Sequence, residues 1–438
     1  MGSSGHKMRI AYCFICIIGS MIAISLSPNT EKDDVIIALK TALAPWKWKR
    51  GGSIHRVEEW FRKQFHTETA YSFNSGRSAL FTILQSFGIG KGDEVIVQAF
   101  TCVAVPEVVM WAGAYPVYCD IDASYNIDPA KLEKLITRKT KVVIVQHTFG
   151  IPARIREIRE IADKYKVIII EDCAHSLGAT VDGKLLGSFG DAAFFSFGRD
   201  KVISSVYGGM AIIKRKNERT KEQRKKELLQ EVHDSIDYPP NDWIVQQLLH
   251  PILCNMLILP LYNVFGIGKF LLVLAQQFKL LSLAVYPGER KGLQPSVFPK
   301  KMPNALAVLA LNQLHKLEQY NSRRLQAAGQ YGKVVEGAIY IRYPLIVNNP
   351  VSFIKSAKQE GILLGNWYHN VVDPDGVDFS AVHYRKGSCP KAEEYASKII
   401  NLPTYPRMKD EEIGRVLRYL KLEVRDWNVD NEVRNSIL

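Results

Sequence analysis

Two strand-like runs that end in charged side chains limit what this chain can fold into. Residues 167–170 read Val-Ile-Ile-Ile and are followed directly by Glu171 and Asp172. An uninterrupted β-branched run is typical of a strand buried on both faces, so it predicts an inner strand of a parallel sheet. A second apolar run, residues 192–197, follows a glycine-punctuated loop and leads to Lys201. Because α/β folds bind ligands at the carboxyl ends of their strands, Asp172 and Lys201 are expected at one site.

An acid and a lysine brought together in this way suit the chemistry of pyridoxal 5′-phosphate (PLP). The lysine forms a Schiff base with the cofactor, and the acid keeps the ring nitrogen protonated so that the ring accepts electrons. Each residue alone has a plainer interpretation, since an Asp after a strand is usually a turn residue and a Lys is usually a surface charge. The combination favours a PLP site.

The sequence around both residues resembles that of the DegT-type sugar aminotransferases. The matching words are EDCAHSLGA at 171–179, GSFGDAAFFSF at 187–197 and GGMAII at 208–213. These enzymes are fold-type I PLP-transferases, so the resemblance implies an α/β fold with a mainly parallel sheet flanked by helices and a smaller α+β C-terminal domain. It also implies catalytic roles for Lys201, which carries the cofactor, for Asp172, which pairs with the pyridinium nitrogen, and for His175, a polar residue near the ring. Ser196 matches a phosphate contact.

A small-residue turn, Ser75-Gly76, opens a predicted helix after a short strand. Free backbone N–H groups at a helix start suit a phosphate, and the turn matches the family's phosphate-binding word. Arg77 replaces the usual threonine there and either contacts the phosphate or points outward. Cys102 occupies the slot of an aromatic residue that stacks on the cofactor, so either Phe100 or another group stacks there, or a smaller side chain covers the ring.

Strands alternate with helices through the first half of the chain, which predicts right-handed crossovers and a mainly parallel sheet. The resemblance covers roughly residues 24–238 and 295–422. We therefore expect a large PLP-binding domain over 24–240 and a small domain over 291–438. His147 at a strand end is either a substrate contact or a structural histidine.

Residues 241–290 are expected to form an apolar helical insertion. Residues 243–268 contain no Asp, Glu, Lys or Arg, and 269–286 place polar residues on one side at helical spacing. Pro251 and Pro260 interrupt the first run, which favours a bent interfacial element over a straight span. The basic residues that flank the segment suit an anionic membrane surface on the cytoplasmic side. Packing against the large domain or in a dimer interface is the alternative.

The N-terminal residues 1–23 include another apolar run, which begins at Ile10 and resembles a short signal anchor. We expect it to touch a membrane. The formal net charge of +13 also indicates anionic partners, and we find no nucleic-acid-binding motif. Seven scattered cysteines form neither a disulfide nor a zinc framework, so no metal site is predicted.

The resemblance implies an aminotransferase that moves an amino group from an amino acid, with glutamate expected, to a keto-sugar carried on a nucleotide or a lipid. It also implies a homodimer. A PLP-dependent sugar dehydratase is a rival, although the family's dehydratases usually replace the lysine that Lys201 retains. A non-catalytic, membrane-bound scaffold is the third hypothesis.

Overall fold

A seven-stranded sheet forms the centre of the computed structural model, which describes residues 22–25, 27–214, 219–262 and 264–423. The strands lie in the order β2-β11-β10-β7-β6-β3-β5. The five strands from β10 to β5 are parallel, and β11 runs antiparallel to both of its neighbours. The expected α/β class is therefore confirmed. The strands are β2 Thr69–Phe73, β3 Glu94–Gln98, β5 Tyr115–Cys119, β6 Thr140–Gln146, β7 Ile168–Asp172, β10 Ala192–Ser196 and β11 Gly209–Ile213.

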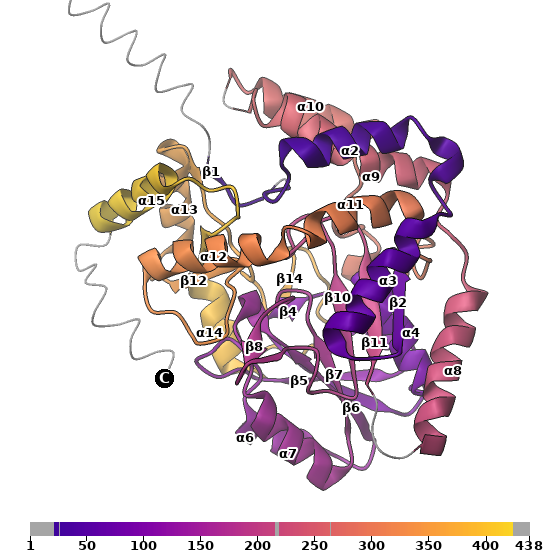
Figure 1. The fold of residues 1–438 in the computed structure, drawn as a ribbon. Coiled ribbons are helices and arrows are strands. Elements are labelled where there is room, and N and C mark those ends of the chain that lie inside the picture. Colours follow the sequence, from indigo (N-terminus) through magenta and orange to yellow (C-terminus); the bar gives the residue numbers. More distant parts are fainter. Residues whose placement is uncertain (1–21, 26, 215–218, 263, 424–438) are drawn as a thin grey trace, which may run out of the picture.

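Helices cover both faces of this sheet (Figure 1). Neighbouring residues of β10 belong to different cores: Phe194 packs in the cluster that contains α4, and Phe195 in the cluster that contains α3. The alternation explains why β10 has no polar residue before Ser196, since both of its faces are covered. The helices of this part are α2 Lys32–Ala42, α3 Gly52–Phe65, α4 Gly76–Ser86, α5 Pro106–Trp111, α6 Pro129–Leu135, α7 Ile155–Tyr165 and α8 Arg219–Ser235.

The C-terminal part is a smaller α+β unit, as expected. Its antiparallel pair is β12 Arg342–Ile346 with β15 Ile399–Pro403, and its helices are α13 Pro350–Gln359, α14 Pro390–Lys398 and α15 Asp410–Glu423. Helices α11 Asn304–Leu314 and α12 Leu317–Tyr331 join it to the large part. The strand β14 Val372–Asp373 pairs with β4 Thr101–Cys102 and so brings C-terminal residues to the edge of the main sheet.

The start of the described chain also belongs to this C-terminal part. The strand β1 Ile22–Ala23 pairs with β13 Ile362–Leu363. Residues 22 and 23 are therefore strand residues and do not belong to a separate apolar segment. The rest of the predicted membrane-touching run, from Ile10 to residue 21, lies outside the described residues.

Residues 241–290 form two helices with a turn between them. These are α9 Asn241–Leu253, which continues into a π-helical turn at Cys254–Ile258, and α10 Ile267–Gln277. Trp243, Ile244 and Leu248 of α9 are buried in the core beside α2 and α11. The packing alternative is therefore correct for α9. Pro251 lies in the last turn of α9, and the helix changes to the π-helical turn two residues after it, so the chain is not a regular α-helix beyond this proline.

The second half of this segment exposes large apolar side chains. Phe265, Phe270 and Phe278 are 92%, 62% and 72% exposed. Within the described ranges, no helix has both the length and the apolar character that crossing a bilayer requires. α10 packs on the π-helical turn that follows α9 and lies at one end of the molecule (Figure 1).

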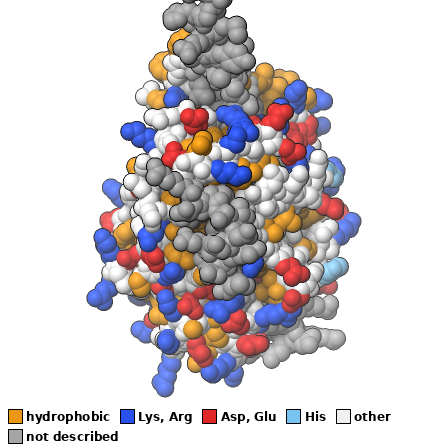
Figure 2. All heavy atoms as spheres, turned by 90° about the vertical axis from the view of Figure 1, so that its left-hand side faces the viewer, with side chains coloured by type: hydrophobic (Ala, Val, Ile, Leu, Met, Phe, Trp, Pro, Cys, Tyr) orange, Lys and Arg blue, Asp and Glu red, His pale blue; other side chains and the backbone are white. Residues whose placement is uncertain are grey.

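The basic excess is not gathered on the face that Figure 2 shows, where blue and red side chains are interspersed over the visible described surface. Of the basic flank before α9, Lys214 donates to the Ser188 carbonyl at 2.7 Å, and the side chains of residues 215–226 lie outside the description. The described cysteines are all free thiols: Cys102, Cys119, Cys173, Cys254 and Cys389. Cys13 and Cys16 lie outside the described residues.

Candidate active site

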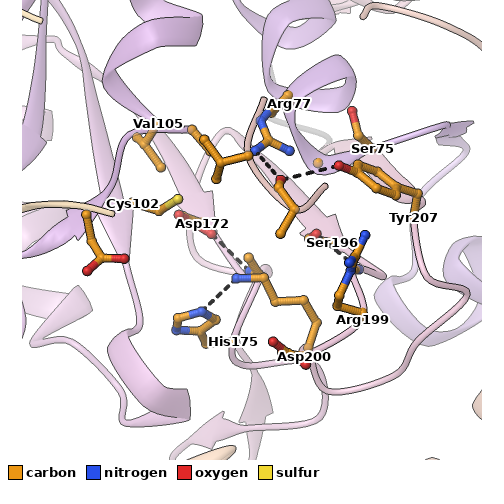
Figure 3. A pocket seen from close by; sticks show the side chains of 18 of the residues that line it. Ser75, Arg77, Cys102, Val105, Asp172, His175, Ser196, Arg199, Asp200 and Tyr207 are labelled. Atoms are coloured by element: carbon orange, nitrogen blue, oxygen red, sulfur yellow. Dashed lines mark hydrogen bonds between the residues drawn. The ribbon is translucent and has the colours of Figure 1, made fainter. Parts of the chain in front are cut away.

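A cavity of about 410 Å³ opens at the carboxyl ends of β7 and β10. Ser75, Asp172, His175 and Ser196 surround it, as Figure 3 shows. Every site residue that the sequence predicted lines this cavity, so the structure brings the whole set together: Ser75, Gly76, Arg77, Cys102, Asp172, His175, Ser196 and Lys201.

Asp172 ends β7 and is 4% exposed. Its Oδ1 accepts the N–H of Ala174 at 2.9 Å, which fixes the carboxylate at the carboxyl end of β7. Burial raises the pKa of Asp172 above its ordinary value, while the hydrogen bond from Ala174 opposes the rise. A cationic group placed in the cavity would pair with this carboxylate and lower its pKa.

His175 contacts the amine of Lys201 directly. The imidazole Nε2 lies 2.8 Å from Nζ of Lys201, and Nδ1 accepts the backbone N–H of Phe149 at 3.3 Å. Burial lowers the pKa of His175 well below 6.5, with further lowering by Arg342, so the ring is neutral. Because Nδ1 accepts, the proton of the neutral ring sits on Nε2 and is donated to Nζ.

Lys201 must therefore accept this hydrogen bond as an uncharged amine. Burial also lowers the pKa of Lys201 below its ordinary value. The amine lies 5.1 Å from the centre of the Trp367 ring, and that ring stacks on His175 with 7° between the planes. The site thus holds a neutral, oriented nucleophile at the end of β10.

Ser75, Gly76 and Ser196 form a close-packed cradle at the start of α4. Ser75 is the N-cap, and its hydroxyl accepts the N–H of Ser78 at 3.1 Å. A Cβ on Gly76 would lie 3.0 Å from Cβ of Ser196, so the backbone there approaches β10 more closely than other residues allow. A helix start with small residues around it suits a phosphate.

Arg77 lies beside this cradle between two buried carboxylates. Its Nε is 3.2 Å from Glu107 and 2.5 Å from Glu289, and both carboxylates are fully buried. Burial raises the pKa of Glu107 well above 4.5, and Glu289 raises it further. Burial lowers the pKa of Arg77, but the two carboxylates outweigh it and the guanidinium stays charged. Of the two alternatives for Arg77, the outward orientation is therefore wrong.

Phe100 does not take the stacking position that the sequence left open. It is fully buried, packs on Phe149 and Tyr368, and is absent from the cavity wall. Cys102 lines the cavity, and so do the aromatic residues Trp367 and Tyr368, so a smaller side chain and another stacking group both stay as predictions. Burial raises the pKa of the Cys102 thiol to about 11, which keeps it protonated.

His147 is a structural histidine and not a substrate contact, which were the two roles that the sequence left open. Its Nδ1 accepts the Ala153 N–H at 3.1 Å, and its Nε2 lies 3.3 Å from Glu171. It is fully buried and does not line the cavity. Both ring nitrogens are therefore used within the fold.

Several site residues come from parts of the chain where the sequence predicted no site. Arg342 of β12 stacks on Trp367, with its Cζ 3.5 Å from the ring centre, and lies 3.8 Å from Asp200. In the sequence, the only indication of these contacts was that Asp200 directly precedes Lys201. Asp200 and Trp367 line the cavity, whereas Arg342 contacts them without lining it. The remaining unexpected cavity residues are Ala104, Val105, Gln146, Ala174, Phe194, Gly198, Arg199, Val206, Tyr207, Gly208, Leu283, Ala284, Val285, Arg290, Tyr368, Asp373 and Pro374.

These groups fit PLP. Lys201 offers a neutral amine, Asp172 a buried acid, and the Gly76–Ser196 cradle a phosphate-sized space at a helix start. A lysine and an acid at adjacent ends of parallel strands, with this cradle beside them, define a PLP-dependent enzyme of fold-type I.

The chain belongs to the DegT/DnrJ/EryC1/StrS aminotransferase family, whose model matches residues 29–230 and 277–421. It is similar to a UDP-N-acetyl-3-dehydro-alpha-D-glucosamine 3-aminotransferase of Acidithiobacillus ferrooxidans, with 27% identity over 79% of this chain and 82% of that protein. It is 39% identical to a GDP-perosamine synthase of Caulobacter vibrioides over 42% of this chain, a match that spans 48% of that protein.

Solved structures share the fold. A putative sugar aminotransferase of Streptococcus pneumoniae in its PMP form has a TM-score of 0.70 at 22% identity, with 90% of this chain and 98% of that chain covered. Together with the family match, this likeness supports PLP as the cofactor of the chain.

Proposed function

We propose that this enzyme transfers an amino group from an amino acid to a keto-sugar joined to a nucleotide or a lipid. The contact between the Lys201 amine and His175, with Asp172 in the same cavity, is the observation that carries the proposal. Relatives named for nucleotide-sugar amination support the acceptor class.

Each site residue has a role that follows from its place. When bound, PLP supplies an electron sink for the substrate carbon. Asp172 holds a positive charge at the ring nitrogen, because it is the buried carboxylate at the end of β7. Lys201 takes and returns the substrate proton at Nζ, and His175 orients that amine by donating from Nε2. Ser75 and Gly76 hold the phosphate together with Ser196.

Arg77 and Cys102 act at the edges of this site. Arg77 reaches the phosphate cradle with a guanidinium whose Nε is already held by Glu107 and Glu289. We infer that it sets the shape and charge of the cradle. Cys102 covers part of the cofactor ring as a neutral thiol.

The amino donor is proposed to be glutamate. A relative of Streptomyces kanamyceticus is named L-glutamine:2-deoxy-scyllo-inosose aminotransferase and is 34% identical over 41% of this chain, so glutamine is the alternative. Mixing PLP-loaded enzyme with glutamate, glutamine or aspartate in the absence of acceptor, and following the cofactor absorbance, separates the three. Glutamate is expected to convert the cofactor fastest, and no conversion by any of them would reject the aminotransferase proposal.

The contact between the Lys201 amine and His175 also disfavours the two rival functions, a dehydratase and a scaffold. A dehydratase of this family usually lacks the lysine, whereas Lys201 is present here, half-buried and hydrogen-bonded to His175. A scaffold has no need of an uncharged, oriented amine, and withdrawing such a group from water costs stability, so its presence favours a catalytic role.

We also propose a homodimer, and contact of residues 256–283 with an anionic membrane surface on the cytoplasmic side. The exposed phenylalanines around α10 support the membrane contact, because contiguous exposed apolar residues mark interaction sites. The insertion interpretation of 241–290 and the boundaries 24–240 and 291–438 stay predictions. Analytical ultracentrifugation and vesicle sedimentation test the dimer and the membrane contact separately.

A further inference from the structure

One wall of the active-site cavity continues into the exposed apolar surface around α10. Leu283, Ala284 and Val285 line the cavity, and they follow the end of α10 by only a few residues. Leu283 is also 37% exposed, so one side chain belongs to both the cavity wall and the outer surface. The mouth of the cavity is therefore apolar on this side.

This wall is held by residues of the cavity itself. Arg77 donates from Nη2 to the Ala284 carbonyl at 2.9 Å, and the Tyr207 hydroxyl donates to the Leu283 carbonyl. Figure 3 shows Arg77 and Tyr207 on the same side of the cavity. Since large-domain residues bind its backbone, the wall is a fixed part of the site.

A further contact ties the wall to the helical pair behind it. Arg199 donates to the Ser282 hydroxyl at 3.0 Å, and that hydroxyl donates to Gln247 of α9 at 2.6 Å. Gln247 is fully buried. The wall thus keeps a set position between the cavity and the exposed side chains.

Outside the cavity the same segment exposes phenylalanine and leucine side chains next to cations. Phe270, Phe278 and Leu280 are exposed, and Lys269 and Lys279 stand among them. Such a surface matches an anionic bilayer in both polarity and charge, because the apolar groups enter the interface while the lysines meet the headgroups.

A cation also stands at the mouth of the cavity. Arg290 lines the cavity and is exposed to solvent. A phosphate between a sugar inside and an apolar chain outside would meet this guanidinium. From the inside of the cavity outward, a ligand would therefore meet the Lys201 amine, then Arg290, and then the apolar side chains of the wall.

From this continuity we propose that the acceptor is a keto-sugar joined through a phosphate or diphosphate to a long apolar chain, which leaves the cavity over Leu283 and Val285 toward a membrane. The inference rests on the proposed aminotransferase function and narrows its acceptor to one of two classes. Nucleotide-linked sugars share the phosphate but lack the chain.

Two probes with the same diphosphate separate these classes. Calorimetric titration of the PLP-loaded enzyme compares farnesyl diphosphate with uridine diphosphate. The proposal expects farnesyl diphosphate to bind at least tenfold more tightly. Equal or tighter binding of uridine diphosphate would overturn it.

Substitution of the wall sharpens this test. Leu283→Ser is expected to weaken the binding of farnesyl diphosphate at least fivefold and to leave the binding of uridine diphosphate unchanged. Leu293→Ser is the matched control, since Leu293 follows shortly after this segment and is 60% exposed but does not line the cavity. An equal effect of both substitutions, or no effect of Leu283→Ser, would contradict the assigned path.

The membrane part is tested by sedimentation with vesicles of phosphatidylglycerol and phosphatidylcholine. The enzyme should sediment with them, Phe270→Ser with Phe278→Ser should abolish this, and Val351→Ser with Leu422→Ser, two exposed residues of α13 and α15, should not. If the enzyme does not sediment with the vesicles, and the variant with Phe270→Ser and Phe278→Ser differs only in its oligomeric state, a second copy of the chain covers this surface and the proposal fails. Conversion of the cofactor by the amino donor needs no acceptor, so it reports separately on the proposed function.

Discussion

Replacing Arg77 with glutamine would leave Glu107 and Glu289 facing each other without a cation. Both carboxylates are fully buried, and the Arg77 side chain is 10% exposed. Removing one partner from a buried ion pair costs about 3–5 kcal/mol, because the remaining charge has lost its compensation. Arg77→Gln should therefore lower the free energy of unfolding, measured in urea at pH 7, by about this amount.

The loss should shrink in acid. Burial and Glu289 already raise the pKa of Glu107 well above 4.5, and without Arg77 the cation that opposes this rise is gone. A raised folded-state pKa contributes stability below the unfolded pKa and loses it as the pH rises through the folded pKa. The difference between Arg77→Gln and the native protein should therefore be smaller at pH 5 than at pH 7.

Glu107→Gln is the matched control. The amide removes one carboxylate and leaves the Arg77 guanidinium paired with Glu289, so this change should cost less than Arg77→Gln. The reasoning is refuted if Arg77→Gln is as stable as Glu107→Gln at pH 7. Loss of PLP affinity with unchanged stability would instead make Arg77 mainly a phosphate ligand.

Three further changes test other parts of the site. Asp172→Asn should slow transamination about 100-fold, or about 2.7 kcal/mol, with PLP still bound, and an unchanged single-turnover rate would assign the role to another acid. Gly76→Ala should weaken the binding of PLP roughly tenfold, because the added Cβ would lie 3.0 Å from Cβ of Ser196. Equilibrium dialysis measures this affinity, and an unchanged value would mean that Ser196 moves to make room. Hydrogen bonding to Asp373 raises the pKa of His369 to about 9, so this pair should stabilise the fold at pH 6 and be lost as the pH rises through 9. His369→Asn should remove that decline in the unfolding temperature, and a parallel decline in the variant would place its cause elsewhere.

The sequence predicted the inner part of the site because that part depends on local patterns. Asp172 and Lys201 follow apolar runs that form β7 and β10, and parallel neighbours bring their carboxyl ends together. Ser75 and Gly76 follow from the strand, turn and helix start at α4. Each of these signals lies within a short stretch of sequence.

The outer part of the site depends on contacts between distant stretches. Trp367 and Arg342 reach Lys201 and Asp200 from the C-terminal unit, and Glu289 reaches Arg77 from beyond α10. No periodicity or spacing in the sequence specifies such contacts. They arise because β4 pairs with β14 and because the wall packs on the large domain.

The segment around α9 shows a different limit. An apolar run without charges is compatible with a buried helix and with an interfacial one, and periodicity does not distinguish them. The deciding facts are that Trp243, Ile244 and Leu248 pack beside α2 and α11, whereas Phe270 and Phe278 find no such cover among the described residues.

The most direct test of the account is to locate the covalent bond between PLP and the protein. Borohydride reduction of the PLP-loaded enzyme, followed by peptide mass spectrometry, should place the cofactor on Lys201, whose amine is neutral and held by His175. Lys201→Ala should lose both the label and all turnover. A label on another lysine, or turnover by Lys201→Ala, would contradict the account.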